Sequence, residues 1–146
     1  MLKDSVEIKS TPEKIFEFFE SWEKNYRRWH PNHGDSRWLK GNLNEPGSIL
    51  YTEEILHGHL HKLKFRITEI EPPSRLSYKF LFPWSLFISK GSFVIERKKN
   101  RCLFTSSLTF RFARLLKTFA KRRMADLKQH MKEEGDNLKR IIESDK

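Results

Sequence analysis

The chain has 146 residues, which fits one domain spanning residues 1–146 and leaves no room for a second hydrophobic core. Apolar residues make up 37% of the chain and charged residues 33%, but 12 Phe, 4 Trp and 3 Tyr supply large core side chains, which excludes a disordered chain. The net charge of +10 favours attraction to anions and does not bear on the fold.

A single cysteine, Cys102, excludes an intrachain disulfide and favours a reducing compartment. The first residues include acids where a signal peptide needs an apolar run. The longest uncharged aromatic-rich stretch, Phe80 to Ser89, is too short to span a bilayer. We therefore expect a soluble, cytoplasmic protein with no membrane span.

The first part of the chain predicts one strand followed by two short helices. Residues 2–9 alternate as a strand does. Thr11 and Pro12 then form a helix start, because a threonine caps the helix and a proline in its first turn loses no hydrogen bond. A second helical piece runs through Trp29 and ends before Gly34.

The rest of the chain predicts a meander of strands and a long helix. Residues 38–112 are divided by turn residues, and apolar residues alternate there with basic ones. Residues 113–143 lack proline and carry apolar residues near the helical period. The fold predicted is α+β, with a curved antiparallel sheet of about seven strands around a long C-terminal helix and two short helices after the first strand.

Three features carry a resemblance to a known fold: the helix start Thr11–Phe16, the hairpin sequence Ile67–Leu76 and the terminal helix. With this order of elements, the chain resembles the helix-grip fold of the START and Bet v 1-like superfamily (SRPBCC), which is also described as polyketide cyclase/dehydrase-like. The resemblance covers nearly the whole chain. It implies a cavity between sheet and helix that holds a small hydrophobic or aromatic molecule.

His130 and Glu134 stand four residues apart on the predicted long helix and therefore project from one face. An imidazole and a carboxylate one turn apart form a common metal half-site. The alternative interpretation is a hydrogen-bonded pair at the edge of the core. The half-site interpretation requires further ligands from elsewhere in the chain.

Two neighbouring segments offer those ligands. The predicted strand carries Glu53 and Glu54, of which alternation brings only one inward, and we choose Glu54 because it shares its parity with apolar neighbours. The segment after the second helix offers His30 or His33. A further histidine cluster lies on a predicted hairpin tip, where solvated histidines are favoured over a metal role: His57, His59 and His61.

A closer resemblance rests on the pattern Tyr26-x-x-Trp29-His30-Pro31-x-His33, an acidic pair before a His-Gly strand, and His130-Met131-x-Glu133-Glu134-Gly135. The pattern resembles the metal-dependent diacetylphloroglucinol hydrolases, which hydrolyse carbon–carbon bonds on the same fold. The resemblance implies a zinc ion held by two histidines and two glutamates, carried over here as His33, Glu54, His130 and Glu134. Candidates to protonate the departing carbon are Tyr26, Tyr51, Tyr78 and the unused histidine, and our catalytic candidates are Tyr26 and His30.

The predicted function is binding of a small apolar ligand next to a metal site, with zinc-dependent hydrolysis of a ketone or carbon–carbon bond as the activity. The alternative is a non-catalytic carrier of a lipid-like or aromatic ligand. The apolar segment Phe80 to Ile88 predicts buried strand ends, with a cavity mouth or a homodimer contact as alternatives. Gly135 predicts close approach of the helix to the sheet, with a helix C-cap as the alternative.

Basic residues gather where the long helix is predicted to begin. A solvated face is the favoured interpretation, and we expect no specific nucleic-acid binding because no recognised motif accompanies the cluster. Its members are Arg111, Arg114, Lys117, Lys121, Arg122 and Arg123.

Overall fold

The computed structural model describes residues 1–56, 58–111 and 121–144, with only the backbone described for residues 121–123. Its elements follow the predicted order of one strand, two short helices, further strands and a long helix. They are β1 (Leu2–Ile8), α1 (Pro12–Glu20), α2 (Trp22–Trp29), β2 (His33–Lys40), β3 (Ile49–Leu56), β4 (His59–Glu71), β5 (Arg75–Phe80), η1 (Trp84–Leu86), β6 (Ile88–Lys98), β7 (Arg101–Phe110) and α4 (Lys121–Ser144).

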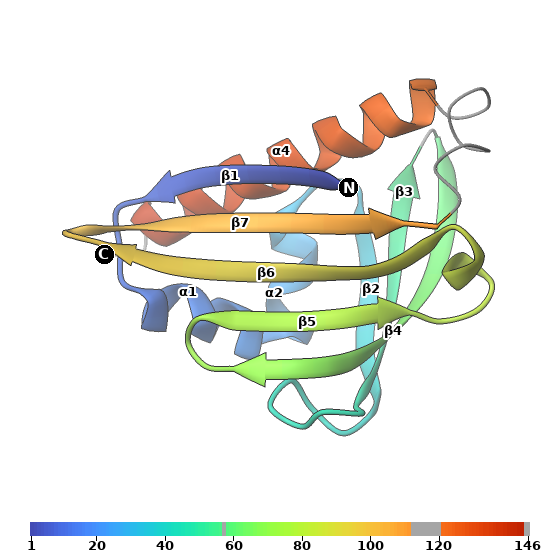
Figure 1. The fold of residues 1–146 in the computed structure, drawn as a ribbon, viewed down its shortest axis with the longest axis horizontal. Coiled ribbons are helices and arrows are strands. Elements are labelled where there is room, and N and C mark those ends of the chain that lie inside the picture. The colour runs from blue at the N-terminus through green and yellow to red at the C-terminus, as the bar shows by residue number, and fades with distance from the viewer. Residues whose placement is uncertain (57, 112–120, 145–146) are drawn as a thin grey trace.

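One antiparallel sheet holds the described strands in the order β1-β7-β6-β5-β4-β3-β2. The sheet is strongly bent, so that β2 and β3 run steeply across the direction of β6 and β7 in Figure 1. The helices pack on one side of it: Phe19 of α1 stacks on Phe93 of β6 with 5.1 Å between ring centroids, and α4 lies along β1. The predicted fold class is confirmed.

Strand alternation decides which face of the sheet is buried. Along β4, Leu63 and Ile67 are buried, whereas Lys62, Lys64 and Arg66 are exposed. A strand repeats every two residues, so the apolar set faces the helices and the basic set faces solvent.

The two short helices fix the position at which β2 begins. The Thr11 hydroxyl oxygen accepts a hydrogen bond from the Lys14 backbone N–H at 3.3 Å, and Pro12 begins α1 as predicted. At the end of α2, Trp29 is 2% exposed and packs edge-on against Phe18. This aromatic contact anchors the segment that follows.

The long helix approaches the sheet closely at Gly135. A Cβ atom there would lie 3.2 Å from Asp4 Oδ2 and 3.4 Å from Val6 Cγ1, both on β1. Gly135 lies within α4, so the prediction of close approach is confirmed and the C-cap alternative is wrong. Leu138, one turn further on, is completely buried.

One expectation about strand limits is wrong and another holds only in part. The strand expected to begin near residue 38 begins at His33, because Gly34 continues the strand, where its missing side chain admits Glu53. In the segment expected to form buried strand ends, Phe80 and Ile88 are buried, but Phe82 is 75% exposed and Phe87 52% exposed. The chain there leaves the sheet through η1, so these two side chains do not share the sheet's buried face.

The basic cluster predicted at the start of the long helix lies mostly outside what the structure describes. Arg114 and Lys117 fall within residues 112–120, and no side chain is described for residues 121–123. Arg111 is described and exposed. No helix in the described parts of the chain combines the length and apolar character needed to cross a bilayer.

Replacing Leu138 with alanine tests the packing of α4 on the sheet. We expect Leu138→Ala to lower the free energy of unfolding by about 2–5 kcal/mol, because it leaves a cavity in a fully buried position. Urea denaturation measures the change. The control Leu39→Ala, at a side chain 47% exposed, should change it by less than about 0.5 kcal/mol. Equal losses in both variants would contradict the packing described.

Candidate metal centre

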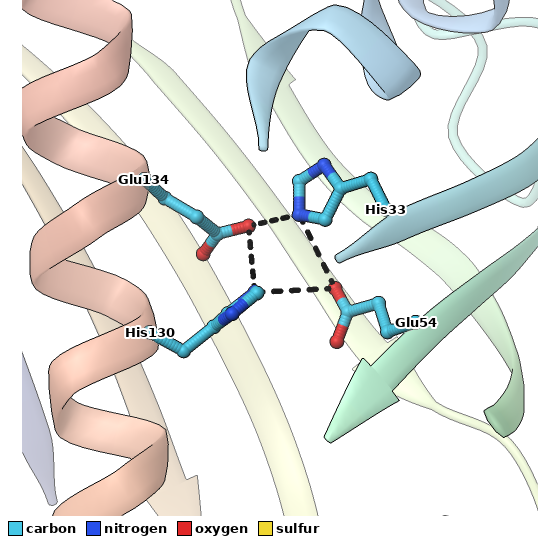
Figure 2. Close-up of side chains that lie close together, drawn as sticks. All are labelled: His33, Glu54, His130 and Glu134. Atoms are coloured by element: carbon cyan, nitrogen blue, oxygen red, sulfur yellow. Dashed lines mark hydrogen bonds and ion pairs between the residues drawn. The ribbon is translucent and has the colours of Figure 1, made fainter. Parts of the chain in front are cut away.

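Four side chains from three separate elements meet at one point inside the protein. His33 begins β2, Glu54 lies on β3, and His130 and Glu134 lie one turn apart on α4. Figure 2 shows that all four point toward one another. One ligand atom from each lies within 4.8 Å of the corresponding atom of every other residue.

Strand register places His33 and Glu54 on the same face of the sheet. The two residues are direct partners in the antiparallel pairing of β2 with β3, and direct partners share a face. The register shifts between His33 and Ser36, and such a bulge redirects the side chains beside it. Glu53, the neighbour of Glu54, faces the other way and accepts a hydrogen bond from Tyr51 at 2.6 Å.

The helix contributes the other two groups because residues four apart share a face. Trp29 fixes the position of α4 relative to the sheet at this point, because its indole N–H donates a hydrogen bond to the backbone carbonyl of Glu134 at 2.8 Å. The end of α2, the start of β2 and the middle of α4 are therefore joined beside the cluster.

The hydrogen bonds of His33 call for a positive group between His33 and Glu134. His33 Nδ1 lies 2.8 Å from the backbone oxygen of Tyr26, which can only accept, so Nδ1 carries a proton. Nε2 lies 2.8 Å from Glu134 Oε2. A bare Nε2 would place its lone pair against a lone pair of Glu134 Oε2. Either a proton or a metal cation must therefore lie between these two atoms.

His130 lacks the hydrogen bonds that a buried imidazole needs. Neither of its ring nitrogens makes a hydrogen bond within the described residues, although the side chain is only 5% exposed. Nε2 lies 3.4 Å from Glu134 Oε2 and 3.9 Å from Glu54 Oε1. A buried polar atom without a partner is costly, so this nitrogen is suited to a ligand that the chain does not itself provide.

The charges of the cluster stabilise one another. Burial alone would raise the pKa of Glu134, but His130 and His33 lower it to about 2. Burial alone would lower the pKa of His130, but Glu134 and Glu54 raise it to about 9. In the metal-free protein at neutral pH, Glu134 is therefore ionised and His130 is protonated.

The donor set and its spacing fit a zinc ion. Zinc takes imidazole nitrogens and carboxylate oxygens, and two tetrahedral ligands at normal bond lengths lie ~3.3 Å apart. The contacts within the cluster are 2.8, 3.4, 3.8 and 3.9 Å, which bracket that separation. A small movement of the side chains would accommodate the ion.

The cluster borders a cavity of about 390 Å³ between the sheet and α4. Glu54, His130 and Glu134 line this cavity, whereas the His33 side chain lies behind them and is fully buried. Most of the remaining described lining is aromatic or aliphatic, and it contains no lysine or arginine. The volume is at the lower end of the range of about 300–1,000 Å³ for small-molecule sites.

His30 takes a different place from His33. Its Nδ1 accepts the Asn32 backbone N–H at 2.9 Å, and its Nε2 donates to Glu133 Oε1 at 2.9 Å. Both ring nitrogens are therefore engaged, and His30 is not among the cavity-lining residues. Its ring packs against His130 with 4.3 Å between centroids.

Tyr26 is the sequence-predicted catalytic candidate that reaches the cavity. Its hydroxyl donates to Glu54 Oε1 at 2.8 Å, and the ring stacks on His33. Burial, followed by the charge of Glu54, raises the pKa of Tyr26 well above its ordinary value. Tyr26 therefore stays protonated at neutral pH.

Sequence reasoning did not single out two further features of the site. One is the bond from Trp29 to the helix backbone, which no sequence signal indicates. The other is the approach of Tyr78 to Gly91, where a Cβ atom would lie 2.5 Å from both Cζ and Oη of Tyr78. A glycine inside a strand is a general signal for such an approach.

His59 and His61 from the predicted hairpin cluster line the cavity at the start of β4, where His61 contacts Trp84 with 5.0 Å between ring centroids. Neither belongs to the two groups of possible metal ligands in the described residues. His57 lies outside the described residues. The smaller of the two groups consists of His30, His130 and Glu133.

A curved antiparallel sheet closed by a long C-terminal helix over an apolar cavity defines a Bet v 1-like helix-grip protein. A family model described as "Polyketide cyclase / dehydrase and lipid transport" matches residues 2–143, and the chain belongs to this family. No curated protein sequence matches the chain.

Several solved structures share this fold. The Zhui aromatase/cyclase from Streptomyces sp. R1128 has a TM-score of 0.76 and 11% identity, over 97% of this chain and 92% of that one. Protein Ms6760 from Mycobacterium smegmatis has a TM-score of 0.75 and 13% identity, over 99% and 91%. Ara h 8.0201 has a TM-score of 0.73 and 17% identity, over 97% and 96%. At these identities the likeness shows the fold alone.

The electrostatics of the cluster predict a pH dependence of stability in chelator-treated protein. The lowered pKa of Glu134 stabilises the fold above its ordinary value of 4.5, and this contribution is lost as the pH falls toward 2. The raised pKa of His130 stabilises the fold below its ordinary value of 6.5, and this contribution is lost as the pH rises through about 9. Urea denaturation should therefore show both contributions in full between pH 4.5 and 6.5.

In His130→Ala, the free energy of unfolding should no longer show the part of its alkaline decline that His130 causes. His59→Ala, at an exposed position, should show the full decline. If His130→Ala and the unmodified protein declined in parallel above pH 6.5, the ion-pairing assigned to His130 would be wrong.

Proposed function

We propose that this domain binds a zinc ion through His33, Glu54, His130 and Glu134, and hydrolyses a small, uncharged carbonyl compound held in the adjoining cavity. The observation that carries the proposal is the buried His130 Nε2, which makes no hydrogen bond within the described residues and faces two carboxylates on the wall of a largely apolar cavity. The sequence resemblance to metal-dependent carbon–carbon hydrolases assigns the same four residues. The TM-scores and the family match support the fold on which that resemblance depends.

The substrate class follows from the charges of the cavity wall. The described lining contains the carboxylates of Glu54 and Glu134 and no cation other than a protonated histidine. The two carboxylates would balance the charge of a bound zinc ion, so an anionic group would meet no net positive charge there to offset its desolvation. An uncharged, largely apolar ketone fits this lining.

A zinc ion in this position would supply Lewis-acid polarisation of a carbonyl oxygen and would favour ionisation of water. In the reaction proposed, water adds its hydroxyl group to the carbonyl carbon, the bond to the adjacent carbon breaks, and the departing carbon receives a proton. The products are a carboxylic acid and a compound with a new C–H bond. The chain must therefore hold the ligand, orient the carboxylates and deliver a proton.

Tyr26 is suited to two of these tasks. Its hydroxyl holds Glu54 in place, and because burial keeps the phenol protonated it retains the proton that a departing carbon requires. Tyr51 lies on the outer face of the sheet, where it contacts Arg37 and Glu53, and does not line the cavity. We assign His30 a supporting role, in which its ring and its bond to Glu133 position His130.

Tyr78 is suited to orienting the ligand. It lines the cavity together with Glu54 and Glu134. Burial, followed by the charges of Glu134 and Glu54, raises its pKa, so it is a donor for a ligand oxygen. Gly91 leaves the space in which the phenol lies.

Metal content tests the proposed centre. Protein purified without an affinity tag should contain close to one zinc ion per chain by elemental analysis, and His130→Ala and Glu134→Gln should each lose most of it because each removes a ligand. Glu133→Gln is the matched control, since Glu133 is the adjacent residue on the helix and bonds His30 instead. Absence of zinc from the unmodified protein, or equal zinc in Glu133→Gln and Glu134→Gln, would refute the centre.

Binding of the neutral fluorescent ketone prodan tests the role of Tyr78. We expect Tyr78→Phe to weaken binding about five- to tenfold through loss of one hydrogen bond, and Gly91→Ala about tenfold because the new Cβ displaces the phenol. Fluorescence titration measures the affinities. Tyr51→Phe, on the outer face, should bind as the unmodified protein does, and equal affinities of all these variants would remove Tyr78 from the site.

A second function is favoured by the size and apolar character of the cavity alone, namely carriage of a lipid-like or aromatic ligand without reaction. The two functions differ in what zinc does. A hydrolase converts its ketone only when zinc-loaded, whereas a carrier binds the ligand equally with and without zinc and releases it unchanged. Mass spectrometry of the bound ligand after incubation distinguishes them.

A further inference from the structure

Exposed apolar side chains gather beside the cavity where β4 begins and where β5 connects to β6. Phe82 is 75% exposed, Leu60 55%, Leu86 52% and Phe87 52%. We call these four residues the apolar tip. They belong to the β5–β6 connection, which contains η1, and to the start of β4, and the contact of His61 with Trp84 joins these segments.

The apolar tip adjoins the cavity mouth. Phe87 itself lines the cavity, as do His59 and His61 beside Leu60 and Trp84 beside Leu86. In Figure 1 the β5–β6 connection projects beyond the ends of the strands. A projecting group of large apolar side chains is unusual for a surface that meets only water.

Unpaired cations lie directly beside the apolar tip. Arg66, Lys79 and Lys90 face one another across β4, β5 and β6 on the exposed side of the sheet. Lys64 accepts the Leu81 backbone N–H, and Arg111 donates its backbone N–H to Phe87, so both also adjoin the tip. We call these five residues the basic flank.

The described part of the chain supplies no counterion to the basic flank. Within residues 1–56, 58–111 and 121–144, none of its side chains forms an ion pair with a carboxylate. Like charges placed opposite one another in a sheet repel, and an external anionic surface would relieve that repulsion.

We propose that the apolar tip and the basic flank together dock this domain on an anionic lipid bilayer, with the cavity mouth facing the membrane. Apolar side chains insert at the boundary between headgroups and acyl chains, and neighbouring lysines and arginines attract anionic headgroups. A nucleic acid would use the cations but would give the protruding Phe82 and Leu86 no apolar partner. The proposal goes beyond the hydrolase function, because it concerns how an apolar ligand reaches the cavity and holds for carrier and hydrolase alike.

Vesicle sedimentation tests the proposal with the full chain. The protein should sediment with vesicles of phosphatidylcholine and phosphatidylglycerol, and about tenfold less with vesicles of phosphatidylcholine alone. Phe82→Ser/Leu86→Ser and Lys79→Glu/Lys90→Glu should each weaken binding to the anionic vesicles about tenfold. All four positions are exposed, so the variants should fold, which thermal unfolding checks.

Matched controls lie away from the tip and the flank. Lys14→Glu/Lys99→Glu, on α1 and in the turn between β6 and β7, makes the same change in net charge, and Leu39→Ser, on the edge strand β2, removes an exposed apolar side chain, so both should keep vesicle binding. Absence of binding to anionic vesicles, or equal losses in control and tip variants, would overturn the proposal. Binding to a DNA duplex that is as tight as vesicle binding and insensitive to Phe82→Ser/Leu86→Ser would also overturn it in favour of a nucleic-acid surface.

Discussion

The burial of two carboxylates beside two imidazoles is the constraint on which this molecule's organisation depends. Each carboxylate would be costly alone in a largely apolar interior, and it is tolerated because positive charge lies within 4 Å. In the absence of metal that charge is a proton on His130, and a divalent cation can take its place. The cluster therefore requires positive charge, and its own side chains supply that charge only when a histidine is protonated.

The surrounding structure fixes the distance between the two halves of the cluster. His33 and Glu54 belong to the sheet, whereas His130 and Glu134 belong to α4, so any shift of the helix along the sheet would separate them. The indole of Trp29 holds α4 at Glu134, and Gly135, the next residue, allows the helix to lie close to β1. Two contacts that involve no ligand atom therefore determine whether the four ligand atoms meet, as expected for a site built on rigid elements.

The sequence predicted what depends on local periodicity. Residues 130 and 134 must share a helix face whatever the tertiary structure, and alternation required Glu53 and Glu54 to face opposite ways, as they do. The choice between His30 and His33 depends on where β2 begins and on its bulge, which are tertiary features, and Gly34 suggested a break where the strand continues. The exposure of Phe82 was predicted only as the alternative, because an apolar segment looks alike whether it ends in the core or at a cavity mouth. The pairing of Tyr78 with Gly91 depends on the register of β5 against β6, and the sequence pattern alone does not reveal that register.

The energetics of the cluster also bear on the choice between hydrolase and carrier. A domain that only carried an apolar ligand would be served as well by leucine or methionine at the positions of Glu54 and Glu134, because replacing a buried ionic group with apolar side chains is often neutral or stabilising. The His130 nitrogens, which make no hydrogen bond within the described residues, add a cost that carriage does not require. The carboxylates of the described cavity wall thus lie where the four ligand atoms converge, and most of the remaining described lining is aromatic or aliphatic. An apolar ketone bound in this cavity could place its reactive oxygen against the point where a metal ion would have ligands.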